Sequence, residues 1–310
     1  MGVGGFAPAM ASSSAARILA AAAGLGIVVF AAGLGFFLSA FPFTLTLLAV
    51  TTFVAALALA LLAGQPRGLQ DVLARFTRIR LEDGGHVGAA ALMVVALWYV
   101  FGVGLTDGAF ALESAARGAT SAAELDPGAL VRGLALNLVM LTFPVLVYVS
   151  FVGGRSPQGA LSELGLDARD ARRGALSGLL LAVAFNLALI VLGAILTALK
   201  VTLPENERAL EIARQITPLG AIGIALVAGV SEEVFFRGFL LPRIGLVAQA
   251  ILFSLVHLSY VNALEIAFTL ALGLVLGYVR RRTGSLWAPI VAHFAFDLIQ
   301  LLGAMYLPRA

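Results

Sequence analysis

Long apolar segments alternate with short polar ones along nearly the whole chain. A helix rises about 1.5 Å per residue, so about 20 apolar residues are needed to cross the hydrocarbon core of a bilayer. The pattern predicts about nine such helices, at residues 18–41, 43–63, 87–105, 129–152, 174–199, 216–241, 244–259, 263–279 and 286–306. The predicted fold class is therefore all-α, a polytopic bundle of transmembrane helices.

The polar connections differ in character. Residues 65–85 are basic and carry apolar side chains at helical spacing, at Leu69, Val72, Leu73, Phe76 and Ile79. This pattern predicts either an interfacial helix on an anionic leaflet or an ordinary amphipathic connector. Residues 106–128 are expected to form a mildly acidic loop, residues 155–173 a second basic loop, and residues 200–215 a polar, partly helical segment.

Composition agrees with a membrane protein. Hydrophobic residues make up 61% of the chain and charged residues 12%, and the mean hydropathy is +1.01, whereas soluble domains are about 25% charged. The excess of 20 Lys+Arg over 17 Asp+Glu is too small to indicate nucleic-acid binding, so the lipid bilayer is the expected partner. The absence of cysteine excludes disulfides, thiolate metal sites and a cysteine nucleophile.

The arginines predict an orientation. With nine spans and a cytoplasmic N-terminus, most basic residues fall on the cytoplasmic side, as the positive-inside rule requires. This set comprises Arg17, Arg67, Arg75, Arg78, Arg80, Arg155, Arg169, Arg172, Arg173, Arg237, Arg243, Arg280, Arg281 and Arg282. The N-terminus is therefore predicted to be cytoplasmic and the C-terminus to lie outside.

Three charged residues interrupt the apolar run 216–241, namely Glu232, Glu233 and Arg237. A charge at the bilayer centre costs about 2.5–3.5 kcal/mol even on lenient scales, so such residues are paired or functional. Glu233 and Arg237 are four residues apart on one helical face, in the favourable order for an ion pair. Glu232 is left to face some other group.

Other polar residues fall at the same depth in the last spans. From a rise of about 1.5 Å per residue, Glu232, His257 and His293 are all placed between the inner leaflet and the midplane, and Asp297 lies one turn beyond His293. Phe253 stands one turn before His257, where its ring could fix the imidazole rotamer. The third histidine of the chain, His86, is expected in a solvated turn. Acidic and imidazole groups from three helices thus predict a functional site that opens toward the cytoplasmic half.

At these residues the sequence resembles the CAAX prenyl endopeptidase and bacteriocin-processing family of membrane proteases. The three motifs of that family are Glu-Glu-x-x-x-Arg, Phe-x-x-x-His and His-x-x-x-Asn/Asp. They correspond in order to Glu232–Arg237, Phe253–His257 and His293–Asp297. The resemblance covers roughly residues 155–306, so we expect an N-terminal transmembrane region of unassigned role at 1–153 and a protease-like core at 154–310.

The resemblance implies an intramembrane peptidase of the glutamic type. Glu232 and His257 would activate a water molecule for attack on a peptide carbonyl, and His293 with Asp297 would stabilise the oxyanion, with Glu233, Arg237 and Phe253 in support. Family members more often carry Asn at the last position. An aspartate donates a hydrogen bond only when protonated, so the safer role for Asp297 is to orient His293 or to complete a metal shell.

No cofactor is expected, although a divalent metal such as zinc is a second option. Two histidines and two carboxylates, from Glu232, His257, His293 and Asp297, suit such an ion. The chain lacks the His-Glu-x-x-His helix of zinc proteases, and the resemblance favours a metal-free mechanism.

The expected substrate is a membrane-associated peptide or protein, or one with a C-terminal signal. The abundance of arginine, alanine and glycine suggests a bacterial plasma (inner) membrane as the location. The alternatives are a non-catalytic immunity or scaffold protein of the same fold and a proton-coupled transporter. No convincing internal repeat supports a transporter.

Overall fold

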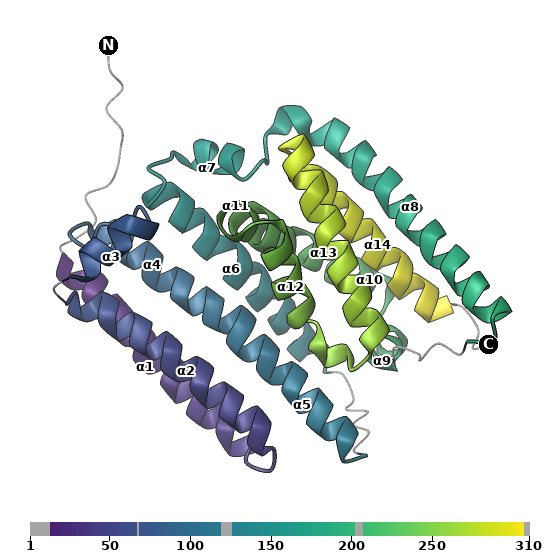
Figure 1. Ribbon diagram of the computed structural model, residues 1–310, viewed down its shortest axis with the longest axis horizontal. Coiled ribbons are helices and arrows are strands. Elements are labelled where there is room, and N and C mark those ends of the chain that lie inside the picture. Colours follow the sequence, from purple (N-terminus) through teal and green to yellow (C-terminus); the bar gives the residue numbers. More distant parts are fainter. Residues whose placement is uncertain (1–12, 67, 119–125, 202–206, 307–310) are drawn as a thin grey trace.

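The computed structural model describes residues 13–66, 68–118, 126–201 and 207–306, and every regular element in these ranges is a helix. The elements are α1 (Ser13–Phe37), α2 (Pro42–Gly64), α3 (Leu69–Phe76), α4 (Gly84–Leu97), η1 (Trp98–Val103), α5 (Gly104–Ala116), α6 (Pro127–Phe151), α7 (Pro157–Glu163), η2 (Ala168–Asp170), α8 (Ala171–Ala198), α9 (Glu207–Gln215), α10 (Pro218–Glu232), η3 (Glu233–Leu240), α11 (Leu241–Ile244), α12 (Leu246–Leu255), η4 (Leu258–Tyr260), α13 (Ala263–Thr283) and α14 (Trp287–Tyr306). Figure 1 shows them as a bundle. The all-α prediction is confirmed.

Several helices start at a side chain that accepts hydrogen bonds from their first backbone N–H groups. Asp126 caps α6, Ser156 caps α7 and Thr217 caps α10, and each is followed by a proline. Such caps satisfy donors that lack a partner inside the helix, and proline at the first position costs no hydrogen bond. The helix starts are therefore encoded locally in the sequence.

One end of the bundle holds the starts of α1 and α14 together with the ends of α2 and α13. Arg17 Nε donates to the carbonyl of Ala63 at 2.6 Å. The N–H of Leu286 donates to the carbonyl of Gly165, in the connection after α7, at 2.8 Å. We call this the arginine-rich end because the described arginines of the two basic connections lie there.

At the opposite end, α5 meets the start of α2 and the turn after α12. The carboxylate of Glu113, near the end of α5, accepts hydrogen bonds from the backbone N–H groups of Phe43 and Thr44 and from the Thr44 hydroxyl. On the same helix, Gly108 lies against Leu258 in η4. Residues 106–116, predicted as loop, are therefore helical. That prediction was wrong because the sequence pattern does not show that Glu113 binds the start of the neighbouring helix α2.

Eight helical segments of the described chain are long and apolar enough to cross a membrane. The ninth predicted span, residues 244–259, is not among them, because its helix α12 has only ten residues. Such a helix rises about 15 Å, and the turn through η4 carries the chain onward to the start of α13 (Figure 1). Within the described ranges, the chain thus makes nine passes between the two ends, one of them only partly helical.

The amphipathic segment predicted within residues 65–85 forms the short helix α3. Leu69 and Leu73 pack against the N-terminal core, while Val72 is exposed. Of the arginines assigned to the cytoplasmic side, Arg237 is instead fully buried inside the bundle, and Arg67 lies outside the described residues. The cytoplasmic placement of the N-terminus stays a prediction.

Two apolar cores hold the bundle together. One joins α1, α2 and the first half of α4, for example through Leu48 and Val87. The other surrounds Phe235 and Phe236 of η3 and takes in side chains of α4, η1 and α6, such as Val145, as well as the C-terminal helices. The core around η3 therefore draws on both sides of the division proposed between residues 153 and 154, which itself stays a prediction.

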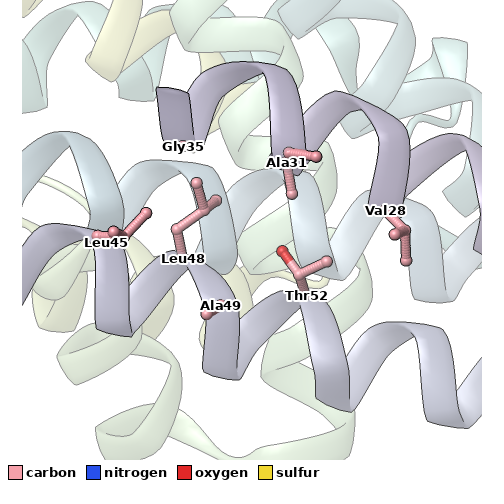
Figure 2. Close-up of a pocket in the computed structure, with 8 residues that line it drawn as sticks. Val28, Ala31, Gly35, Leu45, Leu48, Ala49 and Thr52 are labelled. Carbon is pink, nitrogen blue, oxygen red and sulfur yellow. The ribbon is translucent and has the colours of Figure 1, made fainter. Parts of the chain in front are cut away.

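A pocket of about 340 Å³ lies between α1 and α2 (Figure 2). Its walls are Val28, Ala31, Ala32, Gly35, Leu45, Leu48, Ala49 and Thr52. The only polar side chain is that of Thr52, whose hydroxyl accepts a hydrogen bond from the Trp98 indole at 3.2 Å. No titratable residue lines the pocket, so it cannot supply acid–base chemistry.

The contact between α8 and α14 predicts a stability difference between two glycines of α8. A Cβ at Gly178 would stand 2.6 Å from the carbonyl oxygen of Ala288 and 2.8 Å from the Cβ of Val291, whereas one at Gly193 would meet nothing within 4 Å. Gly178→Ala should lower the free energy of unfolding by about 1–3 kcal/mol, the usual cost of overpacking. Thermal unfolding in detergent measures this difference. Equal melting temperatures for Gly178→Ala and the control Gly193→Ala would contradict the helix contact.

Candidate active site

The centre of the site is an ion pair on η3, a π-helical segment whose eight residues are all buried. Arg237 Nη1 donates to Glu233 Oε1 at 2.7 Å, and both side chains are 0% exposed. The pair that the i, i+4 spacing predicts is therefore formed. π-Helical turns occur frequently at functional sites, which is a first structural reason to regard η3 as one.

The same oxygen of Glu233 also binds His293 from α14. His293 Nδ1 lies 2.8 Å from Glu233 Oε1, and its Nε2 lies 3.4 Å from Asp297 Oδ2. Ionised carboxylates only accept hydrogen bonds. If Glu233 and Asp297 are both ionised, the imidazole between them donates from both nitrogens and carries a positive charge.

His257 lies just beyond the end of α12, in the turn before η4. Its Nδ1 is 2.6 Å from the carbonyl oxygen of Phe253. A carbonyl only accepts, so Nδ1 carries the proton, and in the neutral ring Nε2 is left as an acceptor. The backbone of the preceding turn thereby fixes the tautomer of His257.

The Phe253 ring packs against three members of the cluster. The Arg237 guanidinium carbon lies 4.2 Å above it, and the ring centroids of His257 and His293 lie 4.6 and 6.0 Å away. A cation over an aromatic face is stabilised, the more so where water is excluded. Phe253 therefore fixes the positions of one charge and two imidazoles at once.

Glu232 faces the Nε2 atoms of both imidazoles. Its Oε2 lies 3.9 Å from His257 Nε2 and 4.0 Å from His293 Nε2, and this buried atom has no hydrogen-bond partner within the described chain. The side chains of Glu232, His257 and Asp297 are 21%, 15% and 26% exposed, but that of His293 only 4%. The cluster thus has a closed side at Glu233 and an accessible side at Glu232.

The structure brings all seven predicted site residues into one cluster, and it corrects two details. His257 lies in a turn and not within a membrane helix. His86 is buried and not solvated, since its Nδ1 accepts from the Arg80 N–H and its Nε2 lies 3.5 Å from Asp83.

Two contacts escaped the sequence reasoning. Glu233 binds His293 as well as Arg237, which spacing along one helix cannot reveal. Phe101 of η1 packs its ring against Phe235 and Phe236, with centroids 6.2 Å apart in both cases. Phe101 belongs to the N-terminal region, where no motif indicated a part in the site.

Among the described residues, no set of three or more His, Asp and Glu side chains is arranged to hold a metal ion. The metal-free mechanism nevertheless stays a prediction.

These observations define a class: a polytopic helical membrane protein with a buried cluster of acidic and imidazole groups. Residues 214–299 match the family model described as type II CAAX prenyl endopeptidase Rce1-like. The predicted family resemblance is therefore confirmed for this segment, which contains all three motifs.

The chain is 33% identical over 79 residues to the uncharacterized protein YpbD of Bacillus subtilis (strain 168), a match that covers 25% of this chain and 42% of that relative. The chain thus spans less than half the length of this relative. No solved structure matches this chain significantly.

Breaking the buried ion pair should lower the free energy of unfolding much more than breaking an exposed ion pair. Arg237→Met should lower the free energy of unfolding by about 3–5 kcal/mol, because Glu233 is left buried without its partner. Arg155→Met should cost less than about 1 kcal/mol, since Arg155 and Glu163 are 55% and 40% exposed.

Unfolding in mixed detergent micelles measures both values. Adding Glu233→Gln to Arg237→Met should recover part of the loss, because it removes the unpaired charge. If Arg237→Met and Arg155→Met are equally mild, the pair does not organise the site.

Proposed function

We propose that this protein is an intramembrane peptidase in which Glu232 and His257 activate a water molecule. The observation that carries the proposal is the 3.9 Å between Glu232 Oε2 and His257 Nε2. This distance is too long for a direct hydrogen bond and suits a water that bridges two groups. The match of residues 214–299 to a prenyl endopeptidase family supports the same reaction class.

The hydrogen-bonding capacity of the two groups favours such a water. Ionised Glu232 accepts only, and neutral His257 with its proton on Nδ1 accepts at Nε2. A water between them donates both of its protons and keeps its lone pairs free to attack a carbonyl carbon.

The reaction then proceeds in two steps. The water oxygen bonds to the peptide carbonyl carbon while one of its protons passes to the Glu232–His257 pair. The same proton is returned to the amide nitrogen as the carbon–nitrogen bond breaks, giving a carboxylic acid and an amine. A positively charged His293, held at Nδ1 by Glu233, stabilises the negatively charged oxygen of the tetrahedral intermediate. Asp297, 3.4 Å from His293 Nε2, serves as a positioning residue for that ring.

The proposed substrate is a peptide or protein at the membrane or one with a C-terminal signal. The site is reached from the side where Glu232 and Asp297 are exposed. We propose a bacterial plasma membrane as the location, with the arginine-rich end on the cytoplasmic side. No nucleic acid or cofactor takes part.

Replacing the acid should abolish turnover without unfolding the protein. Glu232→Gln should lower peptide cleavage by about 100- to 10,000-fold, the usual share of general acid–base catalysis. The matched control Glu163→Gln alters a half-exposed glutamate outside the cluster and should keep wild-type cleavage. The assay uses proteoliposomes with two sets of fluorogenic peptides, one farnesylated at a C-terminal cysteine and one unmodified with apolar C-termini.

A second measurement covers natural substrates. New protein C-termini are compared by mass spectrometry in membranes of the native host with wild-type or Glu232→Gln protein. Termini that depend on Glu232 support the peptidase. If neither assay distinguishes the two proteins, a non-catalytic immunity or scaffold role replaces the proposal. A proton flux across proteoliposomes that depends on Glu232 would instead indicate a transporter.

A further inference from the structure

The continuous helix formed by α4, η1 and α5 contacts two parts of the candidate site, namely η3, which follows Glu232, and the turn that holds His257. This helix precedes the segment that matches the protease family. Phe101, Gly104 and Gly108 are spaced i, i+3 and i+7, which places them on about one face of a helix. Phe101 contacts Phe235 and Phe236, which follow the acidic pair after Val234.

The glycines of this face contact the turn that carries His257. A Cβ at Gly108 would stand 2.7 Å from Leu258 Cβ and 3.4 Å from the backbone nitrogen of Ser259. A Cβ at Gly104 would lie 3.6 Å from the Cβ of Val256, the residue before His257. Small residues let backbones approach closely inside membrane bundles, so the turn rests directly on α5.

The turn needs such support because its backbone is strained. Val261, four residues after His257, adopts the left-handed region with φ of 54°. For a β-branched residue this conformation is an outlier that costs about 1–3 kcal/mol and persists only when the surroundings enforce it. On one side Asn262 caps α13 by accepting from the Leu264 N–H, and Ser254 donates to the carbonyl of Ile266. The other support is α5.

We propose that the α4–η1–α5 helix is a positioning element that sets the separation between Glu232 and His257, and that Gly108 is its contact with the His257 turn. One part of the helix supports η3, which follows Glu232, and the next part supports the turn that holds His257. A shift of either contact changes the space for the bridging water. The catalytic consequence rests on the proposed peptidase function, whereas the structural statement does not.

The test observes the histidine itself. The chain contains three histidines, so protein labelled with ¹⁵N-histidine gives three sets of ring signals in micelles, assigned through His86→Gln, His257→Gln and His293→Gln. The wild-type His257 ring should show the Nδ1-protonated tautomer. Gly108→Ala should shift the His257 ring nitrogens toward a mixture of tautomers and leave the His86 signals in place.

Two controls separate positioning from general loosening. Gly133→Ala adds a methyl group that meets nothing within 4 Å, and should leave all three histidines unchanged. Gly174→Ala collides with the Cβ of Trp287 at 2.5 Å, on helices other than α5, and should lower the melting temperature without moving the His257 signals.

Leu258→Ala removes the contact from the other side and keeps the test decisive if Gly108→Ala does not fold. It should shift the His257 ring signals in the same direction. Unchanged His257 signals in whichever of the two variants folds would overturn the proposal.

Kinetics then link the position to turnover. If the wild type cleaves peptides, Gly108→Ala should lower kcat by about 100-fold, the cost of a displacement near 1 Å, with KM little changed. A shifted His257 ring in a protein whose wild type cleaves nothing would support the positioning role and contradict the peptidase function. A lowered kcat with unchanged His257 signals would support the peptidase function and contradict the positioning role.

Discussion

The structure depends on one constraint: a carboxylate and a guanidinium, those of Glu233 and Arg237, are held inside an apolar bundle with no exposed surface. Removing two charges from water costs several kcal/mol for each, and the cost is recovered only when the geometry of the pair and its neighbours is good. Here the neighbours are the imidazole of His293 and the ring of Phe253. The groups that make burial of the pair tolerable are the same groups that carry the candidate chemistry, so stability and site geometry are tied together.

What the sequence predicted well depends on neighbours within one helix. Long apolar runs identify spans, and the spacing of Glu233 and Arg237 predicts their pairing from helix geometry alone. The meeting of Glu232, His257 and His293 could be predicted because each stands out as a polar residue at one depth of an apolar segment. The match of residues 214–299 to a protease family is consistent with these motifs.

What could not be predicted depends on contacts between helices or on the end of a helix inside an apolar run. Residues 250–256 are apolar apart from Ser254, so nothing in the pattern marks the end of α12 before His257. The bond from Glu233 to His293 joins residues 60 positions apart. Gly108 carried no signal in a chain with 34 glycines, since only the structure shows which of them another backbone approaches. Glu113 was read as a loop residue because its partners on α2 lie far away in sequence.

The π-helical character of η3 has a consequence for natural variation. A π turn closes i→i+5 hydrogen bonds and so accommodates one more residue than an α turn. Deleting a single residue here would restore the ordinary pitch and leave the flanking helices in nearly the same orientation, but the packed segment would lose one of its eight buried side chains and its ion pair would change spacing. Evolution can therefore exchange side chains within this stretch, but insertions and deletions should be purged from it, and the length of residues 232–241 should vary less than their identity.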